Sequence, residues 1–232
     1  MATTSHLSGK VALVTGGSKG IGAAIAQALA VAGASVASTS RSGGGPTAAN
    51  LLQICADVRK PDDAARAVGE AVRAFGGLDI LINNAGVGGF APVAEMTIEQ
   101  WQQIIDTNLS GVFYCCHAAI PELRKRGGGW IINISSLAAR NAFTGGAAYC
   151  ASKAGLNQFS EALMQEVRYD GIRVSYVMPG SVDTGFMGRG ISKAGWASTS
   201  EDVAQVVLDL IAMPPRSLPS RVELRPSQPP RK

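Results

Sequence analysis

Tyr149 and Lys153 stand four residues apart in a segment, residues 147–170, whose apolar side chains recur at helical spacing. Gly171 follows this segment as a stop signal. Positions i and i+4 lie on one face of a helix, so the phenol and the ammonium would point the same way. A nearby cation favours phenolate and lowers a tyrosine pKa that is normally about 10. The pair could pass a proton to or from a substrate oxygen, although an ordinary amphipathic helix can carry the same two residues.

A glycine-rich turn follows the first predicted strand. The strand is VALVT, a β-branched run typical of a buried parallel strand, and the turn reads TGGSKGIG before a helical stretch. Glycines here allow a tight turn and let backbone N–H groups approach a pyrophosphate at the helix N-terminus. An ordinary strand-to-helix turn is the alternative. The residues expected to contact a dinucleotide are Gly16, Ser18, Lys19, Gly20, Ile21 and Gly22.

The second predicted strand, ASVASTSR, ends in Ser40 and Arg41, where NAD-binding folds place an acidic residue on the ribose 2′-hydroxyl. The first acidic residue after the glycine turn is Asp57. A guanidinium at the strand end, together with Lys19, suits a 2′-phosphate, because both cations bind phosphate and the guanidinium can do so in bidentate fashion. The sequence therefore predicts NADP(H) over NAD(H), unless both cations are solvated surface charges.

Strands and helices alternate along the rest of the chain, which predicts an α/β fold with a doubly wound, seven-stranded parallel sheet and helices on both faces. A capping-box pattern at Thr97 and Gln100 begins one of the helices. Ligands bind such sheets at the carboxyl ends of the strands, and the residues singled out fall there. Among them, Asp57 and Val58 are expected at an adenine edge, and Asn83 and Asn84 are expected to tie neighbouring strands together.

Composition limits the classes of partner. The net charge of +4 comes from the segment after residue 213, which carries five cationic residues and one acidic residue, so the body has no basic stripe for nucleic acid. No apolar run reaches transmembrane length. The four cysteines lack metal-ligand spacing, which predicts no metal site and reduced thiols in the cytoplasm. We expect one domain, residues 1–232, with a short flap at about 184–200 and a frayed tail at about 226–232.

Taken in order, these motifs resemble the short-chain dehydrogenase/reductase family, and in particular NADPH-dependent carbonyl and 3-oxoacyl reductases. The family's TGxxxGIG, NNAG, YxxxK and PGxVxT motifs match residues 15–22, 83–86, 149–153 and 179–184. The family's serine lies thirteen residues before the tyrosine, at Ser136, and its asparagine matches Asn108 in a TNLxGxF context. The match runs from about residue 10 to the last predicted strand.

The resemblance implies a Rossmann fold and a role for each matched residue. Tyr149 would protonate a carbonyl oxygen, Lys153 would lower the tyrosine pKa and hold the nicotinamide ribose, and Ser136 would donate a hydrogen bond to the substrate oxygen. Asn108 would hold a water that links Lys153 to solvent. The remaining expected cofactor contacts are Asn84, Ala85, Gly86, Pro179, Gly180, Val182 and Thr184, in addition to the glycine turn, Arg41, Asp57, Val58, Tyr149 and Lys153.

The predicted function is reduction of a ketone or aldehyde, with a 3-oxoacyl thioester among the candidates, by an enzyme that forms a homotetramer or homodimer. Two alternatives stay open: a secondary-alcohol dehydrogenase and a non-catalytic NADP-sensing protein. The stretch from residue 41 to residue 57 is too short for the helix that the family usually places there. Most of the candidate substrate contacts are small or apolar, which favours a neutral substrate, whereas the nearby charges of Arg140 and Arg189 argue against one. The candidate contacts are Ala138, Asn141, Phe143, Gly145, Gly180, Ser181, Phe186, Met187 and Trp196.

Overall fold

A computed structural model describes residues 6–184 and 195–229. Seven parallel strands form one sheet in the order β3-β2-β1-β4-β5-β6-β7. The strands are β1 (Val11–Thr15), β2 (Ser35–Ser40), β3 (Leu51–Cys55), β4 (Ile80–Asn83), β5 (Gly129–Ile134), β6 (Ile172–Pro179) and β7 (Arg221–Leu224). The helices are α1 (Gly20–Val31), α2 (Pro61–Phe75), α3 (Ile98–Ile105), α4 (Gly111–Lys125), α5 (Ala147–Val167) and α6 (Ser200–Ala212).

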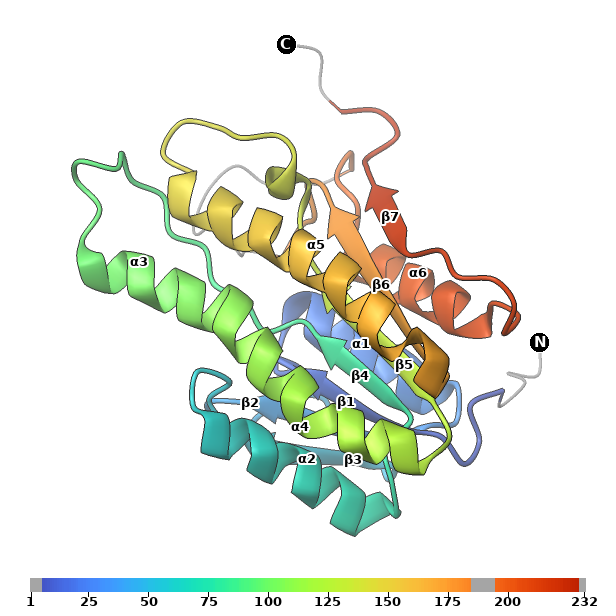
Figure 1. Cartoon of the computed structure of the whole chain (residues 1–232). Coiled ribbons are helices and arrows are strands. Elements are labelled where there is room, and N and C mark those ends of the chain that lie inside the picture. The colour runs from blue at the N-terminus through green and yellow to red at the C-terminus, as the bar shows by residue number, and fades with distance from the viewer. Residues whose placement is uncertain (1–5, 185–194, 230–232) are drawn as a thin grey trace.

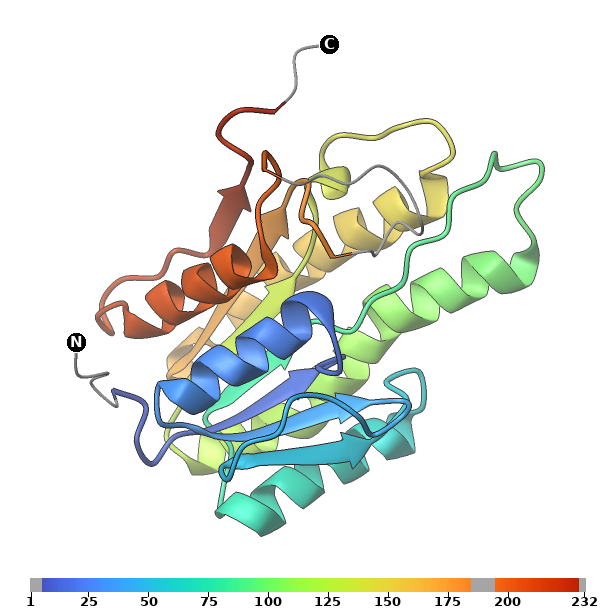
Figure 2. The same cartoon turned by 180° about the vertical axis from the view of Figure 1, so that it is seen from behind.

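Helices cover both faces of the sheet. In Figure 1, α2, α4 and α5 lie in front of it, and Figure 2 shows α1 and α6 on the opposite face. Each face has its own apolar core. Because both faces are covered, all five residues of β1 are buried, which explains why that strand reads as an unbroken apolar run. The predicted doubly wound α/β fold is confirmed.

The strand order reverses between β1 and β4. From β1 the chain builds outward to β2 and β3, then crosses over to β4 and builds outward to β7. Such a reversal leaves a crevice at the carboxyl ends of the central strands, where ligands of open α/β sheets bind. In Figure 1 these ends lie at the side of the molecule that carries the loop before α5 and the segment after β7.

Local signals in the sequence mark the start of α3 and the end of the α5 segment. Thr97 accepts a hydrogen bond from Gln100 N, and Gln100 Oε1 accepts one from Thr97 N, so the predicted capping box is confirmed. Gly171 follows a short 3₁₀ turn after α5 with φ at +73°, as its role of stop signal requires.

A π-helical segment, Asp106–Ser110, joins α3, which begins at the predicted capping box, to α4. The backbone N–H of Gly111 bonds to the carbonyl of Asp106 across the widened turn. A π segment adds a residue to one turn without ending the helix, and this one has no side-chain cap that the sequence could reveal. Asn108 lies at the middle of it.

The connection from β2 to β3, residues 41–50, contains no helix, as its length predicted. Asn50 Nδ2 ties the connection to α1 by donating to the carbonyls of Ala30 and Ala34 at 3.0 and 2.7 Å. Gln53 Nε2 donates to the carbonyl of Pro46 at 2.7 Å. Side-chain hydrogen bonds therefore fix the loop in place of helix packing.

The four cysteines, Cys55, Cys115, Cys116 and Cys150, are all free thiols. Within the two described stretches, no helix combines the length and the hydropathy that crossing a bilayer requires.

Candidate active site

A cavity of about 830 Å³ runs along the carboxyl ends of the strands. One part, which we call the glycine-turn end, is lined by residues from 16–22, 39–41 and 56–59. The other part, which we call the tyrosine end, is lined by residues from 87–90, 134–143, 149–153 and 225–229. All of the predicted cofactor contacts line this one cavity: Gly16, Ser18, Lys19, Gly20, Ile21, Gly22, Arg41, Asp57, Val58, Asn84, Ala85, Gly86, Tyr149, Lys153, Pro179, Gly180, Val182 and Thr184.

The glycine turn requires its glycines because another loop packs against it. A Cβ on Gly16 would lie 2.8 Å from Ala85 Cα, and φ at Gly16 is +67°. A Cβ on Gly22 would lie 2.3 Å from Asn84 Nδ2 and from the carbonyl of Gly16. The same Asn84 amide donates to the carbonyls of Thr15 and Gly16 at 3.0 and 3.1 Å. The N-terminus of α1 thus faces the cavity with its first backbone N–H groups, an arrangement that fits a pyrophosphate.

The glycine-turn end is rich in cations. Lys19 and Arg41 are exposed and line it, as does Arg59, which the sequence did not single out. Arg59 Nε donates to both carboxylate oxygens of Asp57 at 3.0 Å, and this hydrogen bonding holds the pKa of Asp57 below its usual value. Thr39 also lines this end, and its buried hydroxyl has no hydrogen-bond partner within the described chain. The donors and positive charge fit a phosphorylated ribose.

At the tyrosine end, α5 places Tyr149 and Lys153 one helical turn apart. Lys153 is 4% exposed, and its Nζ donates to the carbonyl of Ile134, the last residue of β5, at 2.8 Å. Ser136 lies just past β5, and its Oγ accepts a hydrogen bond from Ala138 N at 3.1 Å. A further hydrogen bond joins the side chains of Ser136 and Tyr149. The strand end and the helix therefore bring three of the four predicted catalytic side chains to one wall of the cavity.

Burial controls the protonation of this pair. It lowers the pKa of Lys153 to about 8. It also raises the pKa of Tyr149, and the hydrogen bond with Ser136 opposes this rise only in part. The predicted lowering of the Tyr149 pKa by Lys153 is therefore wrong in this structure, because the lysine amine is directed to the Ile134 carbonyl and desolvation of the phenol dominates.

Asn108 lies behind the cavity wall rather than on it. Its Nδ2 donates to the carbonyl of Val87 and to Ser152 Oγ, both at 3.0 Å, and its Oδ1 accepts from Val87 N at 2.8 Å. A Cβ on Gly86 would lie 3.4 Å from Asn108 Oδ1 and 3.7 Å from Lys153 Nζ. Both polar groups thus border the space beside Gly86, and the predicted water between Asn108 and Lys153 stays a prediction.

A row of buried amides ties the elements around the site together. Asn83 Nδ2 donates to Asn133 Oδ1, and Asn133 Nδ2 donates to Ser160 Oγ, both at 2.8 Å. These bonds join β4, β5 and α5. The predicted tie through Asn83 is confirmed, whereas Asn133 and Ser160 were not singled out. Their signal was a polar residue inside the apolar strand WIINI and a serine on the apolar face of the helix.

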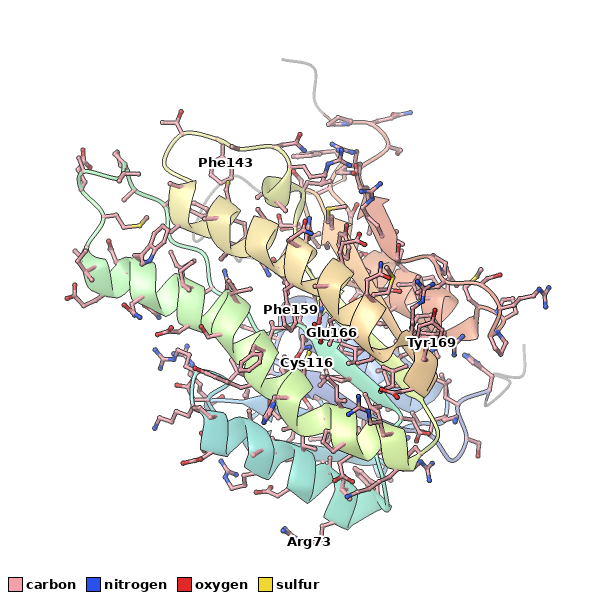
Figure 3. All side chains as sticks on the ribbon, in the orientation of Figure 1. Arg73, Cys116, Phe143, Phe159, Glu166 and Tyr169 are labelled. Atoms are coloured by element: carbon pink, nitrogen blue, oxygen red, sulfur yellow. The ribbon has the colours of Figure 1, made fainter. Side chains whose placement is uncertain are left out.

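Aromatic rings line the mouth of the tyrosine end. Phe90 contacts Phe143 with ring centroids 5.5 Å apart, and it meets Tyr149 edge-on at 5.8 Å. Phe143 belongs to the loop that precedes α5 (Figure 3). The phenol of Tyr149 therefore borders a largely apolar wall.

The predicted substrate contacts divide into three groups. Those that line the cavity are Ala138, Asn141, Phe143, Gly180, Ser181 and Trp196. Gly145 and Arg140 are not among the lining residues, and Arg140 pairs with Glu223. Phe186, Met187 and Arg189 lie outside the described residues.

Sequence reasoning missed Phe90, Leu137, Arg225, Pro226 and Pro229, which also line the cavity. Each follows the carboxyl end of a strand, β4, β5 or β7, so the rule that ligands bind at those ends could have found them.

The family model described as short chain dehydrogenase matches residues 10–194. The 3-oxoacyl-[acyl-carrier-protein] reductase FabG of Escherichia coli is 42% identical over 77% of this chain and 76% of its own length. The 2,5-dichloro-2,5-cyclohexadiene-1,4-diol dehydrogenase LinX of Sphingobium indicum is 40% identical over 78% of this chain and 76% of its own. An alcohol dehydrogenase from the archaeon Thermococcus sibiricus, solved in complex with 5-hydroxy-NADP, superposes with a TM-score of 0.85 at 27% identity, covering 96% of this chain and 99% of that one.

Proposed function

The chain belongs to the short-chain dehydrogenase family, and on that premise we propose that it reduces a ketone or aldehyde to an alcohol with NADPH. Membership makes it an oxidoreductase that interconverts a carbonyl and an alcohol. The direction, the choice of NADP(H) and the residue roles given below are the proposal.

One observation supports reduction as the direction of the reaction. The phenol of Tyr149 lines the cavity, shares a hydrogen bond with Ser136 and has a raised pKa, so it is protonated at neutral pH. A proton donor must hold its proton before the reaction, and a phenol of raised pKa does so. Reduction of a carbonyl needs such a donor, whereas oxidation of an alcohol needs a base.

The bound nicotinamide would supply the hydride, and this chain's own residues would do the rest. Ser136 would donate a hydrogen bond to the carbonyl oxygen and fix its position, while Tyr149 gives that oxygen a proton. Lys153 and Asn108, on either side of the space beside Gly86, would return a proton to the phenol. Asn108 owes its placement to the π segment, and such segments often mark functional sites.

Charge supports NADP(H). Lys19 and Arg41 line the glycine-turn end, and Ser40 occupies the strand end where an acidic residue would repel a 2′-phosphate. Arg59 neutralises Asp57, the one carboxylate that lines this end in the described chain. A 2′-phosphate would therefore meet uncompensated positive charge.

A second candidate direction is the oxidation of a secondary alcohol. Relatives with comparable identity include one named as a diol dehydrogenase and one, from Mycolicibacterium smegmatis, named as a D-threitol dehydrogenase. The relative named as a 3-oxoacyl reductase places a 3-oxoacyl thioester among the substrates to test first.

A homotetramer or homodimer in the cytoplasm completes the proposal. Phe113 on α4 is 49% exposed, and β7 is an edge strand, so both elements offer surfaces that a second copy could cover. The four free thiols are in keeping with a reducing compartment.

The test is consumption of NADPH and of NADH by the purified protein with a panel of ketones, aldehydes and a 3-oxoacyl thioester. We expect turnover with NADPH at least about tenfold more efficient than with NADH, and we expect Arg41→Gln to remove most of that preference while leaving turnover with NADH unchanged. Faster turnover with NADH would refute the cofactor proposal. Turnover only in the presence of alcohols and oxidised cofactor would favour the second candidate.

A further inference from the structure

The C-terminal end of the chain contributes a charged residue to the tyrosine end of the cavity. The carbonyl of Leu224, the last residue of β7, accepts a hydrogen bond from Gly180 N at 2.8 Å. A Cβ on Gly180 would lie 2.9 Å from Leu137, the residue that follows Ser136. Arg225 comes directly after Leu224 and lines the cavity. Its backbone is thus fixed beside the catalytic residues.

A carboxylate shared by two arginines leaves excess positive charge at this place. Glu223 Oε2 accepts a hydrogen bond from Arg225 Nη2 at 2.9 Å, and Glu223 Oε1 accepts one from Arg140 Nη1 at 2.6 Å. Two cations against one anion give this cluster a net charge of +1. Arg140 does not line the cavity, whereas Arg225 does and its side chain is 55% exposed. The excess charge therefore faces the cavity through Arg225.

Neither Glu223 nor Arg140 lines the cavity beside Arg225. Apart from the buried Lys153, Arg225 is the one charged residue that lines the tyrosine end within the described chain. The other lining side chains of this end include Val87, Phe90, Leu137 and Phe143. The Glu223 carboxylate is shared with Arg140, so it offsets only part of the charge on Arg225, and the remaining positive charge attracts an anion to this end of the cavity.

We propose that Arg225 binds an oxyanion group, a carboxylate or a phosphate, at the end of the substrate remote from its carbonyl. The inference rests on the proposed function of this cavity and narrows its substrates to oxo compounds that carry an anionic group. A guanidinium presents five N–H donors in one plane, and the contact with Glu223 leaves donors for a bidentate pair with the substrate. Phe90 and Phe143 would cover the apolar body between the two polar ends.

The test measures binding, so that it does not depend on turnover. Methyl ketones of increasing chain length that end in a carboxylate, a phosphate monoester or the uncharged amide are titrated by calorimetry into the enzyme saturated with NADP⁺. At the chain length that spans the cavity, we expect at least one anion to bind about tenfold more tightly than the amide, the size of a charge-assisted pair. The carboxylate and phosphate arms identify which anion the site takes.

Three variants separate a role in binding from a role in folding. Arg225→Gln should remove the preference for the anion and leave the affinity for the amide unchanged. Glu223→Gln should increase the preference, because it raises the net charge of the cluster, whereas damage to β7 would weaken all ligands in both variants. Arg216→Gln is the matched control: it removes an exposed arginine from the same part of the chain, outside the cavity, and should change nothing.

Equal affinity for anion and amide at every chain length would overturn the inference, as would a preference that persists in Arg225→Gln. Oxidation of NADPH with the same ketones is followed in parallel. Turnover without any anion preference would leave the proposed function standing and remove the role of Arg225. An intact anion preference without turnover of any ketone would refute the proposed function and leave Arg225 as an anion-binding residue.

Discussion

The two ends of the cavity are built in different ways. At the glycine-turn end, the backbone determines the shape: Gly16 and Gly22 leave no room for a Cβ, and the Asn84 amide bonds to main-chain carbonyls. At the tyrosine end, side chains determine the shape, and they come from loops after β4, β5 and β7 that meet only in the folded protein. Phe90 and Phe143, which form the mouth there, are 39% and 43% exposed.

The two ends therefore differ in how far their residues can be substituted. A backbone cradle accepts few substitutions, since any side chain at Gly22 collides with the main chain. An exposed aromatic or arginine side chain can change without disturbing the sheet beneath it. The glycine-turn end is therefore suited to one cofactor, while the tyrosine end can be adapted to different substrates. Three predictions probe this contrast.

The largest effect is expected at the tyrosine end. Tyr149→Phe removes the proposed proton donor and keeps the ring that packs against Phe90. We expect kcat to fall about 10³-fold, within the range for loss of a general acid. The affinity for NADPH, measured by the quenching of protein fluorescence, should change less than about threefold. Undiminished turnover would remove Tyr149 from the role of proton donor.

At the glycine-turn end, the quantity expected to fall is the affinity for NADPH rather than kcat. In Gly22→Ala, the new methyl group would meet the Gly16 carbonyl and the Asn84 amide, so the turn must shift away from the cofactor. We expect NADPH affinity to fall about 10²-fold, by analogy with the loss of several hydrogen bonds of about 1 kcal/mol each. Isothermal titration with NADPH measures it.

Gly69→Ala is the control for this substitution. Gly69 is exposed within α2, and a Cβ there meets nothing within 4 Å. Alanine should raise the free energy of unfolding by about 1 kcal/mol and leave NADPH affinity unchanged, because glycine is a poor helix former. If Gly22→Ala bound NADPH as tightly as Gly69→Ala, the turn would not be the cofactor cradle.

The same contrast explains which features could be predicted from the sequence. The alternation of strands and helices, the glycine turn and the capping box at Thr97 depend on local spacing, and the structure has them as predicted. The direction of the Tyr149 pKa shift was not predictable, because it depends on burial by residues distant in sequence. The sequence shows the charge of Arg225 among the cationic residues after residue 213, but it does not show that the folded chain brings this residue beside Gly180.

The smallest effect concerns Lys153, the buried lysine of the tyrosine end. Burial lowers its pKa from 10.5 to about 8, a cost of about 3 kcal/mol in the free energy of folding when the amine is charged in both states. Lys153→Met removes this cost but also loses the hydrogen bond to the Ile134 carbonyl, and that loss cancels about 1 kcal/mol of the gain in stability. We therefore expect the variant to be about 2 kcal/mol more stable than the parent at neutral pH.

The pH dependence identifies the cause. Below the folded pKa of about 8 the full cost is present, since the amine is protonated in both states. Between about 8 and 10.5 the folded state has released the proton and the unfolded state still holds it, so the parent gains stability with rising pH and the advantage of Lys153→Met shrinks. Urea unfolding across this range measures the difference, with Lys60→Met, at an exposed lysine, as the control. An advantage that stays constant with pH would mean that the lysine is destabilising for reasons of packing rather than charge.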